Sequence, residues 1–213
     1  NNPILGKVAI QKYYSDGETG LLEPEANTTF QVYLKSKGSY EACTDYERAI
    51  IKTDSNGYAV TGNLYYGTYV VHQVDSGDVD AIHVDDFDVE VTENGKVYTY
   101  PLNNKLFKAY LKILKKDKQT EKQVLKPGTA YKIYRVTDDG EELVSQSYSN
   151  GNQIKTIDTF ITDESGEIMT VKPLRSAKYR IYEVDSANGL HIVKKFIEVE
   201  INSKADNYES YVD

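Results

Sequence analysis

Apolar and polar residues alternate along most of the chain in short runs that turn residues interrupt. In "KVAIQK" (7–12) and "YLKILK" (110–115), two aliphatic residues and then a lysine, Lys12 or Lys115, fall on one face of an extended strand, because side chains alternate sides in a strand. Asn-Gly, Asp-Gly and Ser-Gly pairs separate the runs, and no segment keeps a helical period over three turns. The pattern therefore predicts an all-β fold of short strands.

The chain contains an internal repeat, since similar segments occur twice in the same order. The matching pairs are "TTFQVYL" (28–34) with "TAYKIYRV" (129–136), "YVVHQVDS" (69–76) with "YRIYEVDS" (179–186), and "FDVEVTENGKVYTYPLN" (87–103) with "FIEVEINSKADNYESYVD" (196–213). Short strands at this spacing are typical of antiparallel sandwiches. The repeat predicts two tandem copies of one β-sandwich.

The boundary between the copies can be placed because "NNKLFKAYLKI" (103–113) echoes "NNPILGKVAIQ" (1–11). We therefore expect unit one to span 1–104 and unit two to span 105–213, both of ordinary domain size. The echo also makes the first two residues resemble the end of a preceding copy. It predicts that the chain is a segment of a longer array with very short linkers.

Composition narrows the function. The net charge of −8 and the pI near 5.0 argue against nucleic acid or an anionic membrane as a partner. No apolar run approaches the ~18 residues of a membrane span, so we expect no membrane contact by this segment. The single Cys43 excludes an internal disulfide and is interpreted as a small, half-buried residue.

The sequence contains no motif for a metal site, a cofactor site or a turnover enzyme. The acidic segments 75–80 and 83–88 lack the full ligand pattern of a calcium loop, and the three histidines lack zinc spacing. No phosphate-binding glycine loop or nucleophile motif is present. We therefore expect no metal, no cofactor and no turnover enzyme.

The lysine on the apolar face of each first strand is the unusual feature. Such a lysine can lie at the strand end and extend to solvent. Alternatively it is buried beside a partner, since "YRIYEVDS" puts Glu183 on the same face as two apolar residues. A buried lysine loses its proton more easily, and a neutral amine is a nucleophile toward a carboxamide or carboxyl group. The product would be an intramolecular amide, with loss of ammonia from Asn or water from Asp.

Further motifs point to a family. A "TDxxG" turn occurs at 53–57 and 162–166, followed by a pattern close to "LxxGxYxxxE" at 64–73 and 174–183, and by a last strand that ends in Asn or Asp. Each unit resembles a Cna B-type (SpaA-like) domain of Gram-positive surface adhesins and pilins. The resemblance implies a transthyretin-like, reversed-immunoglobulin sandwich. It also implies an isopeptide bond between the first and last strands, assisted by the central glutamate.

In unit two the resemblance assigns Lys115 as the amine, Glu183 as the proton carrier and Asp213 as the acceptor. Asn202 is an alternative acceptor, although alignment with Asn94 places it in the preceding hairpin turn. Unit two is therefore expected to form an isopeptide bond.

In unit one the resemblance assigns Lys12 as the amine and Asn103 or Asn104 as the acceptor. Gln73 departs from the pattern, since an amide cannot take up and return a proton as a carboxyl group can. Unit one is therefore expected to lack the acid and to form no bond.

These features predict a structural stalk of a cell-wall-anchored surface adhesin or pilin, outside a Gram-positive cell. Its expected partners are neighbouring domains of the same longer chain. The alternative is an adhesive module that binds a host extracellular matrix protein or glycan through its loops, with 36–50 and 137–158 as candidates. Any catalysis would be a single, self-directed bond formation.

Overall fold

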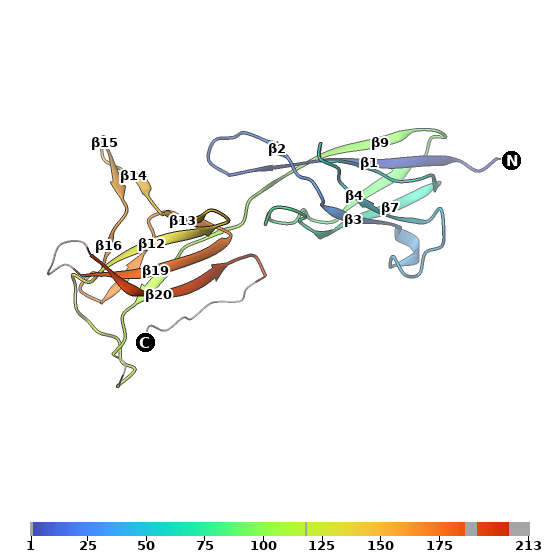
Figure 1. The fold of residues 1–213 in the computed structure, drawn as a ribbon. Coiled ribbons are helices and arrows are strands. Elements are labelled where there is room, and N and C mark those ends of the chain that lie inside the picture. The colour runs from blue at the N-terminus through green and yellow to red at the C-terminus, as the bar shows by residue number, and fades with distance from the viewer. Residues whose placement is uncertain (1, 118, 186–190, 205–213) are drawn as a thin grey trace. The chain divides into compact units, whose positions relative to one another are not determined.

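The computed structural model describes residues 2–117, 119–185 and 191–204. It confirms the all-β expectation: the described residues form strands and one three-residue 3-10 helix, Lys35–Lys37. Contacts divide the chain into two compact units, Asn1–Leu106 and Phe107–Asp213 (Figure 1). No helix among the described residues is long and apolar enough to cross a membrane.

Unit one is a sandwich of two sheets. One sheet is built around β1 (Leu5–Ser15), which pairs in parallel with β9 (Val97–Lys105) on one side. On its other side β1 pairs antiparallel with three short strands: β2 (Glu23–Pro24), β5 (Tyr58–Val60) and β6 (Leu64–Tyr65). The second sheet has the order β4 (Arg48–Lys52), β3 (Thr29–Leu34), β7 (Gly67–Asp75) and β8 (Phe87–Val91).

The core of unit one lies between these sheets, as the alternation of apolar residues predicts. It contains Val8, Ile10, Phe30, Val32, Ile51, Ala59, Leu64, Tyr69, Val71, Val89 and Val91, all buried. These residues come from strands of both sheets, so the apolar face of each sheet covers that of the other.

The first and last strands of unit one form a ladder of nine residue pairs, from Lys7 beside Val97 to Ser15 beside Lys105. Figure 1 shows β1 and β9 running side by side. Along β9 the side chains alternate between exposed and half-buried, and the half-buried set starts at Tyr98 and ends at Asn104. This alternation places Asn104 on the same inner face of the sheet as the buried Lys12 of β1.

Unit two has one larger sheet and several short strand pairs. The sheet has the order β13 (Gly140–Leu143), β12 (Ala130–Thr137), β19 (Ala177–Asp185) and β20 (His191–Ile201), and β16 (Phe160–Ile161) also pairs with β12. The short pairs are β10 (Lys108–Ala109) with β18 (Leu174–Arg175), β11 (Lys112–Leu114) with β17 (Glu167–Met169), and the hairpin of β14 (Gln146–Asn150) with β15 (Gln153–Ile157).

Two contacts occur in both units. Thr53 Oγ1 accepts the backbone N–H of Thr28 at 2.9 Å, and Thr162 Oγ1 accepts that of Thr129 at 3.0 Å. Each central strand carries a fully buried tyrosine in the core cluster of its unit. The segment of unit two that corresponds to β9 falls on 205–213, outside the described residues.

Candidate functional site

Lys12 lies inside unit one. Its side chain has no solvent exposure, so the interpretation of a lysine that extends to solvent is wrong for this residue. The backbone is fixed on both sides of the residue: Lys12 donates its N–H to Gly57 O at 2.7 Å and accepts from Glu25 N–H at 3.0 Å. The backbone of β1 therefore holds the Lys12 side chain on the core face of the sheet.

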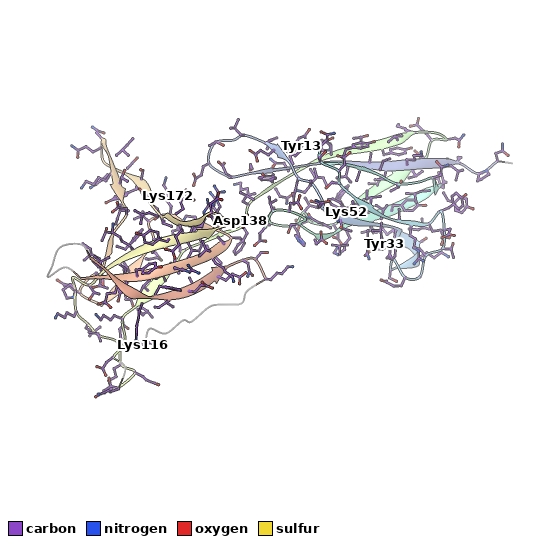
Figure 2. The ribbon with its side chains drawn as sticks, viewed as in Figure 1. Tyr13, Tyr33, Lys52, Lys116, Asp138 and Lys172 are labelled. Atoms are coloured by element: carbon purple, nitrogen blue, oxygen red, sulfur yellow. The ribbon has the colours of Figure 1, made fainter. Side chains whose placement is uncertain are left out.

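The partner of this amine is Glu25. Lys12 Nζ donates to Glu25 Oε2 at 2.5 Å and to the backbone oxygen of Tyr13 at 2.8 Å, and neither side chain of the ion pair is exposed. Tyr13 is labelled in Figure 2, at the part of β1 where this contact forms. Burial lowers the pKa of Lys12 below its usual value of 10.5, and the hydrogen bond and charge of Glu25 oppose that shift.

Local turn chemistry places Glu25 there. Asp16 Oδ1 accepts the backbone N–H groups of Glu18 and Thr19, which caps the turn that sends the chain back along β1. The returning β2 pairs with the end of β1, and Thr53 Oγ1 then donates to the backbone oxygen of Glu25 at 2.7 Å. The carboxyl group of Glu25 is therefore held under the sheet beside Lys12.

Asn104 supplies a carboxamide on the same inner face. In the parallel register Lys12 lies beside Leu102 and Tyr14 beside Asn104, so Asn104 is two residues further along the adjacent strand. Asn103, by contrast, is exposed on the outer face. Of the two acceptors expected for unit one, Asn104 is therefore the one on the same face of the sheet as the buried amine.

Three buried oxygens around this set have no hydrogen-bond partner among the described residues: Glu25 Oε1, Asn104 Oδ1 and Thr28 Oγ1. In unit two the threonine equivalent to Thr28, Thr129, accepts a hydrogen bond from Lys115 Nζ. Buried polar groups in proteins are nearly always paired, so three unpaired oxygens in one region are unusual.

Gln73 has a structural role. Its side chain is buried, its Oε1 accepts the backbone N–H of Val84 at 2.9 Å, and its Nε2 donates to the backbone oxygen of Asp75 at 3.1 Å. Gln73 thus anchors both ends of the 75–84 loop. The expectation that unit one has no carboxyl group beside its lysine is wrong, because Glu25 supplies one from a different segment.

In unit two the expected lysine and glutamate are in contact. Lys115 Nζ donates to Glu183 Oε1 and to Thr129 Oγ1, both at 3.3 Å. The pair is more open than that of unit one, with the two side chains 31% and 41% exposed. Figure 2 labels Lys116, the next residue along the chain. The expected acceptor Asp213 lies outside the described residues.

The alternative acceptor in unit two, Asn202, is in the wrong place. Its Oδ1 accepts the backbone N–H of Lys204 at 3.0 Å within a turn. The preceding residue, Ile201, pairs with Ala177, which is six residues before Glu183 on β19. At about 3.4 Å per residue this puts Asn202 roughly 20 Å from the Lys115–Glu183 contact.

The carboxyl group beside the lysine thus comes from a different segment in each unit. Asp16 and Thr28 are separated by as many residues as Asp117 and Thr129. This equal spacing aligns Glu25 with Lys126, which is exposed. The central strands align Gln73 with Glu183. This paired exchange is visible in the sequence, and it is the signal by which Glu25 could have been found.

Other candidate chemistry is sparse. Among the residues that the structure describes, no group of three or more His, Cys, Asp or Glu side chains is placed to hold a metal ion. Cys43 is buried rather than half-buried, and its thiol lies 3.4 Å from the backbone oxygen of Ser39.

Comparisons with known proteins bear mainly on the fold. The family model of the SpaA prealbumin-like fold domain matches residues 109–213. Among solved structures, the Bacillus anthracis TIE protein is 22% identical with a TM-score of 0.60, over 93% of this chain and 32% of that one. The chain therefore spans about a third of the TIE protein.

Two pilin structures are more distant. The shaft pilin SpaA of Lactobacillus rhamnosus GG is 15% identical with a TM-score of 0.39, covering 93% of this chain and 94% of that chain. GBS52, the minor pilin of Streptococcus agalactiae, is 16% identical with a TM-score of 0.39, covering 98% and 100%. No curated protein sequence matches the chain significantly.

Proposed function

Residues 109–213 belong to the SpaA family of prealbumin-like fold domains, and from this premise we propose that the chain is a structural stalk segment of a surface pilin or adhesin. In this proposal unit one is a second domain of the same kind. The segment lies outside a Gram-positive cell and separates a distal part of the protein from the cell wall. Its partners are neighbouring domains of the same longer chain.

The observation that carries this proposal is the parallel pairing of β1 with β9 in unit one. The chain enters at the N-terminal end of β1 and leaves at the C-terminal end of β9, which are opposite ends of the ladder. Tension along the chain therefore pulls the two strands past each other and loads all nine residue pairs together. A stalk under tension benefits from this arrangement, because the bonds cannot break one at a time.

In unit two we assign the covalent reinforcement to Lys115, with Glu183 as the proton carrier and Asp213 as the acceptor. The contact between Lys115 and Glu183 supports this assignment. Condensation of the amine with a carboxyl group releases one water. The expected product is an isopeptide bond that closes unit two near its end.

The alternative function as an adhesin has one supporting feature. The hairpin of β14 and β15 stands apart from the sheet of unit two in Figure 1, and its Ile154 is 80% exposed. The hairpin lies in the 137–158 region that the sequence favours for ligand binding. Binding of the chain to an array of matrix proteins and glycans, lost when 146–157 is replaced by a short turn, would favour this alternative.

Single-molecule pulling tests the stalk function. Handles at the two chain termini load β1 and β9 in shear, whereas handles at Asn2 and Gly95 lie at one end of the ladder and peel the strands apart. We expect unit one to resist a clearly higher force in the first geometry. Equal or lower resistance there would contradict a role in carrying tension.

A further inference from the structure

The buried site of unit one is energetically unfavourable as long as its side chains have not reacted. A lysine and a glutamate are both removed from water, and one oxygen of the glutamate has no partner among the described residues. Removing two charges from water costs several kcal/mol per ion before their attraction is counted. The unpaired oxygens of Asn104 and Thr28 add to this cost.

We propose that Glu25, rather than residue 73, is the proton carrier that joins Lys12 Nζ to Asn104 Cγ in an isopeptide bond. The proposal deepens the stalk function, on which its biological purpose rests, because it ties together the two strands that tension would separate. It assigns a catalytic role to a residue of the β2–β3 connection, whereas the family pattern assigns that role to the central strand.

The contacts give the order of events. The reaction begins when one proton passes from Lys12 to Glu25, which turns the ion pair into a neutral amine and a carboxylic acid. The amine then attacks Asn104 Cγ, and a bond forms between Nζ and Cγ. Glu25 accepts a proton from the attacking nitrogen and delivers one to the carboxamide nitrogen. The bond from Cγ to Nδ2 breaks and ammonia leaves.

The atoms balance. An ammonium, a carboxylate and a carboxamide become a secondary amide, a carboxylic acid and ammonia. Glu25 is left as the neutral acid and holds the proton that Lys12 first gave up. No oxidant, metal or other co-reactant is needed.

The product also removes the defects of the starting arrangement. Both buried charges disappear. The O–H of Glu25 can donate to the new amide oxygen, which was the unpaired Asn104 Oδ1, and the new amide N–H remains a donor toward Glu25. The three side chains are thus better satisfied after the reaction than before it.

Position 73 cannot serve in the same way. Gln73 uses its oxygen and its nitrogen on the backbone of the 75–84 loop. The exchange between the units supports the same conclusion: unit one has Glu25 and Gln73, and unit two has Lys126 and Glu183. Each unit keeps one carboxyl group beside its lysine, from one segment or the other.

The test follows the covalent state of the full chain by mass spectrometry under denaturing conditions, at intervals after cell-free synthesis. We expect the peptides that carry Lys12 and Asn104 to appear as one branched species, lighter by one ammonia than their sum. Glu25→Gln keeps the size of the side chain and should slow this joining by about 10²–10⁴-fold. The matched control is Glu23→Gln, two residues earlier and exposed, which should join at the wild-type rate.

Three further variants keep the test decisive if Glu25→Gln folds poorly. Asn104→Asp should join with loss of water and give the same final mass as the wild type, whereas Asn103→Asp should still lose ammonia at Asn104. Gln73→Glu should join as the wild type does.

Separate peptides for Lys12 and Asn104 in the wild type would overturn the proposal. So would joining only in Gln73→Glu, or joining of a folded Glu25→Gln variant at the wild-type rate. These outcomes leave the stalk function standing, since resistance to force in the shear geometry is measured independently.

Discussion

Unreacted, Lys12 and Glu25 form a buried ion pair that is expensive to keep and harder still to break from one side. Removing a single partner of such a pair leaves an uncompensated buried charge, at a cost of about 3–5 kcal/mol. Both side chains are fully enclosed, so water cannot relieve either one. The proposed reaction removes both charges and, with them, this cost.

The state before reaction can be trapped and examined through its pH dependence. Asn104→Ala removes the acceptor and leaves Lys12 unreacted. Because burial holds the pKa of Lys12 below 10.5, the unfolded chain binds more protons than the folded chain between the lowered pKa and 10.5. The free energy of unfolding of unit one should therefore rise with pH across this window.

Urea unfolding from about pH 7 to about pH 9.5 measures this dependence, within the range where the free lysine is still charged. The control adds Lys12→Met and Glu25→Gln to the trapped variant, which removes both members of the buried pair. The difference between the two proteins should grow in favour of the trapped variant as pH rises. A flat or falling difference would show that burial does not lower the pKa of Lys12.

Tyr69 is a buried residue whose hydroxyl stabilises a different part of unit one. The hydroxyl of Tyr69 donates to the backbone oxygen of Tyr65 at 2.8 Å and lies 3.2 Å from that of Tyr46, and burial raises its pKa to about 12. Tyr69→Phe should lower the free energy of unfolding by about 1–2 kcal/mol, since it removes the buried hydroxyl that donates to the backbone oxygen of Tyr65, whereas the backbone oxygen of Tyr46 keeps the N–H of Tyr65. Tyr66→Phe, at an exposed tyrosine, should change it far less, and equal losses in chemical denaturation would contradict the assignment.

Among the strands and turns, the close approach of β1, β2 and the 54–57 turn holds the reactive groups together. Gly57 has φ +74°, and a Cβ at this position would lie 2.2 Å from the backbone oxygen of Lys12. That contact is impossible without movement of the backbone. The glycine therefore fixes how closely the turn can pack under the lysine.

Gly57→Ala should both destabilise unit one, by roughly 1–3 kcal/mol, and slow the joining of Lys12 to Asn104. The matched control is Gly95→Ala, since Gly95 has φ +79° but a Cβ added there would meet nothing within 4 Å. The difference between the variants isolates the contact from the backbone conformation. If both variants join and unfold alike, the packing of the turn does not control the site.

The strand pattern explains which site residues could be predicted from the sequence. Strict alternation placed Lys12 and Lys115 on the core face and brought Glu183 to Lys115, because a strand that buries one face leaves no choice of side. The same alternation through Tyr98 and Leu102 places Asn104, and not Asn103, on the core face. The sequence therefore contains the signal that distinguishes the two candidate acceptors.

Glu25 was harder to predict for a physical reason. It follows a two-residue strand, Glu23–Pro24, which is too short to show any alternation. Its burial depends on tertiary pairing with β1 and on the hydrogen bond from Thr53 to its backbone oxygen. Neither contact has a local sequence signature, so only a position-by-position comparison of the two repeats points to Glu25.

For the whole molecule, the bond between Lys12 and Asn104 would close a loop of about 90 residues. By the chain-entropy estimate used for disulfides, such a closure stabilises the folded state by about 4–5 kcal/mol. The bond would also limit how far tension can extend the chain. Force along the chain could separate the few residues outside the loop, but it could not extend the loop itself.

The contour length gained on mechanical unfolding tests this account most directly. The full chain is pulled from its two termini and compared with the double variant Lys12→Met, Glu25→Gln, which has neither the amine nor an unpaired buried carboxylate. About 90 residues at 3.3–3.6 Å each correspond to roughly 300 Å. We predict that the double variant gains about 300 Å more contour length than the wild type, because residues 12–104 extend only in the variant. Equal gains in the two proteins would contradict the covalent tie in unit one.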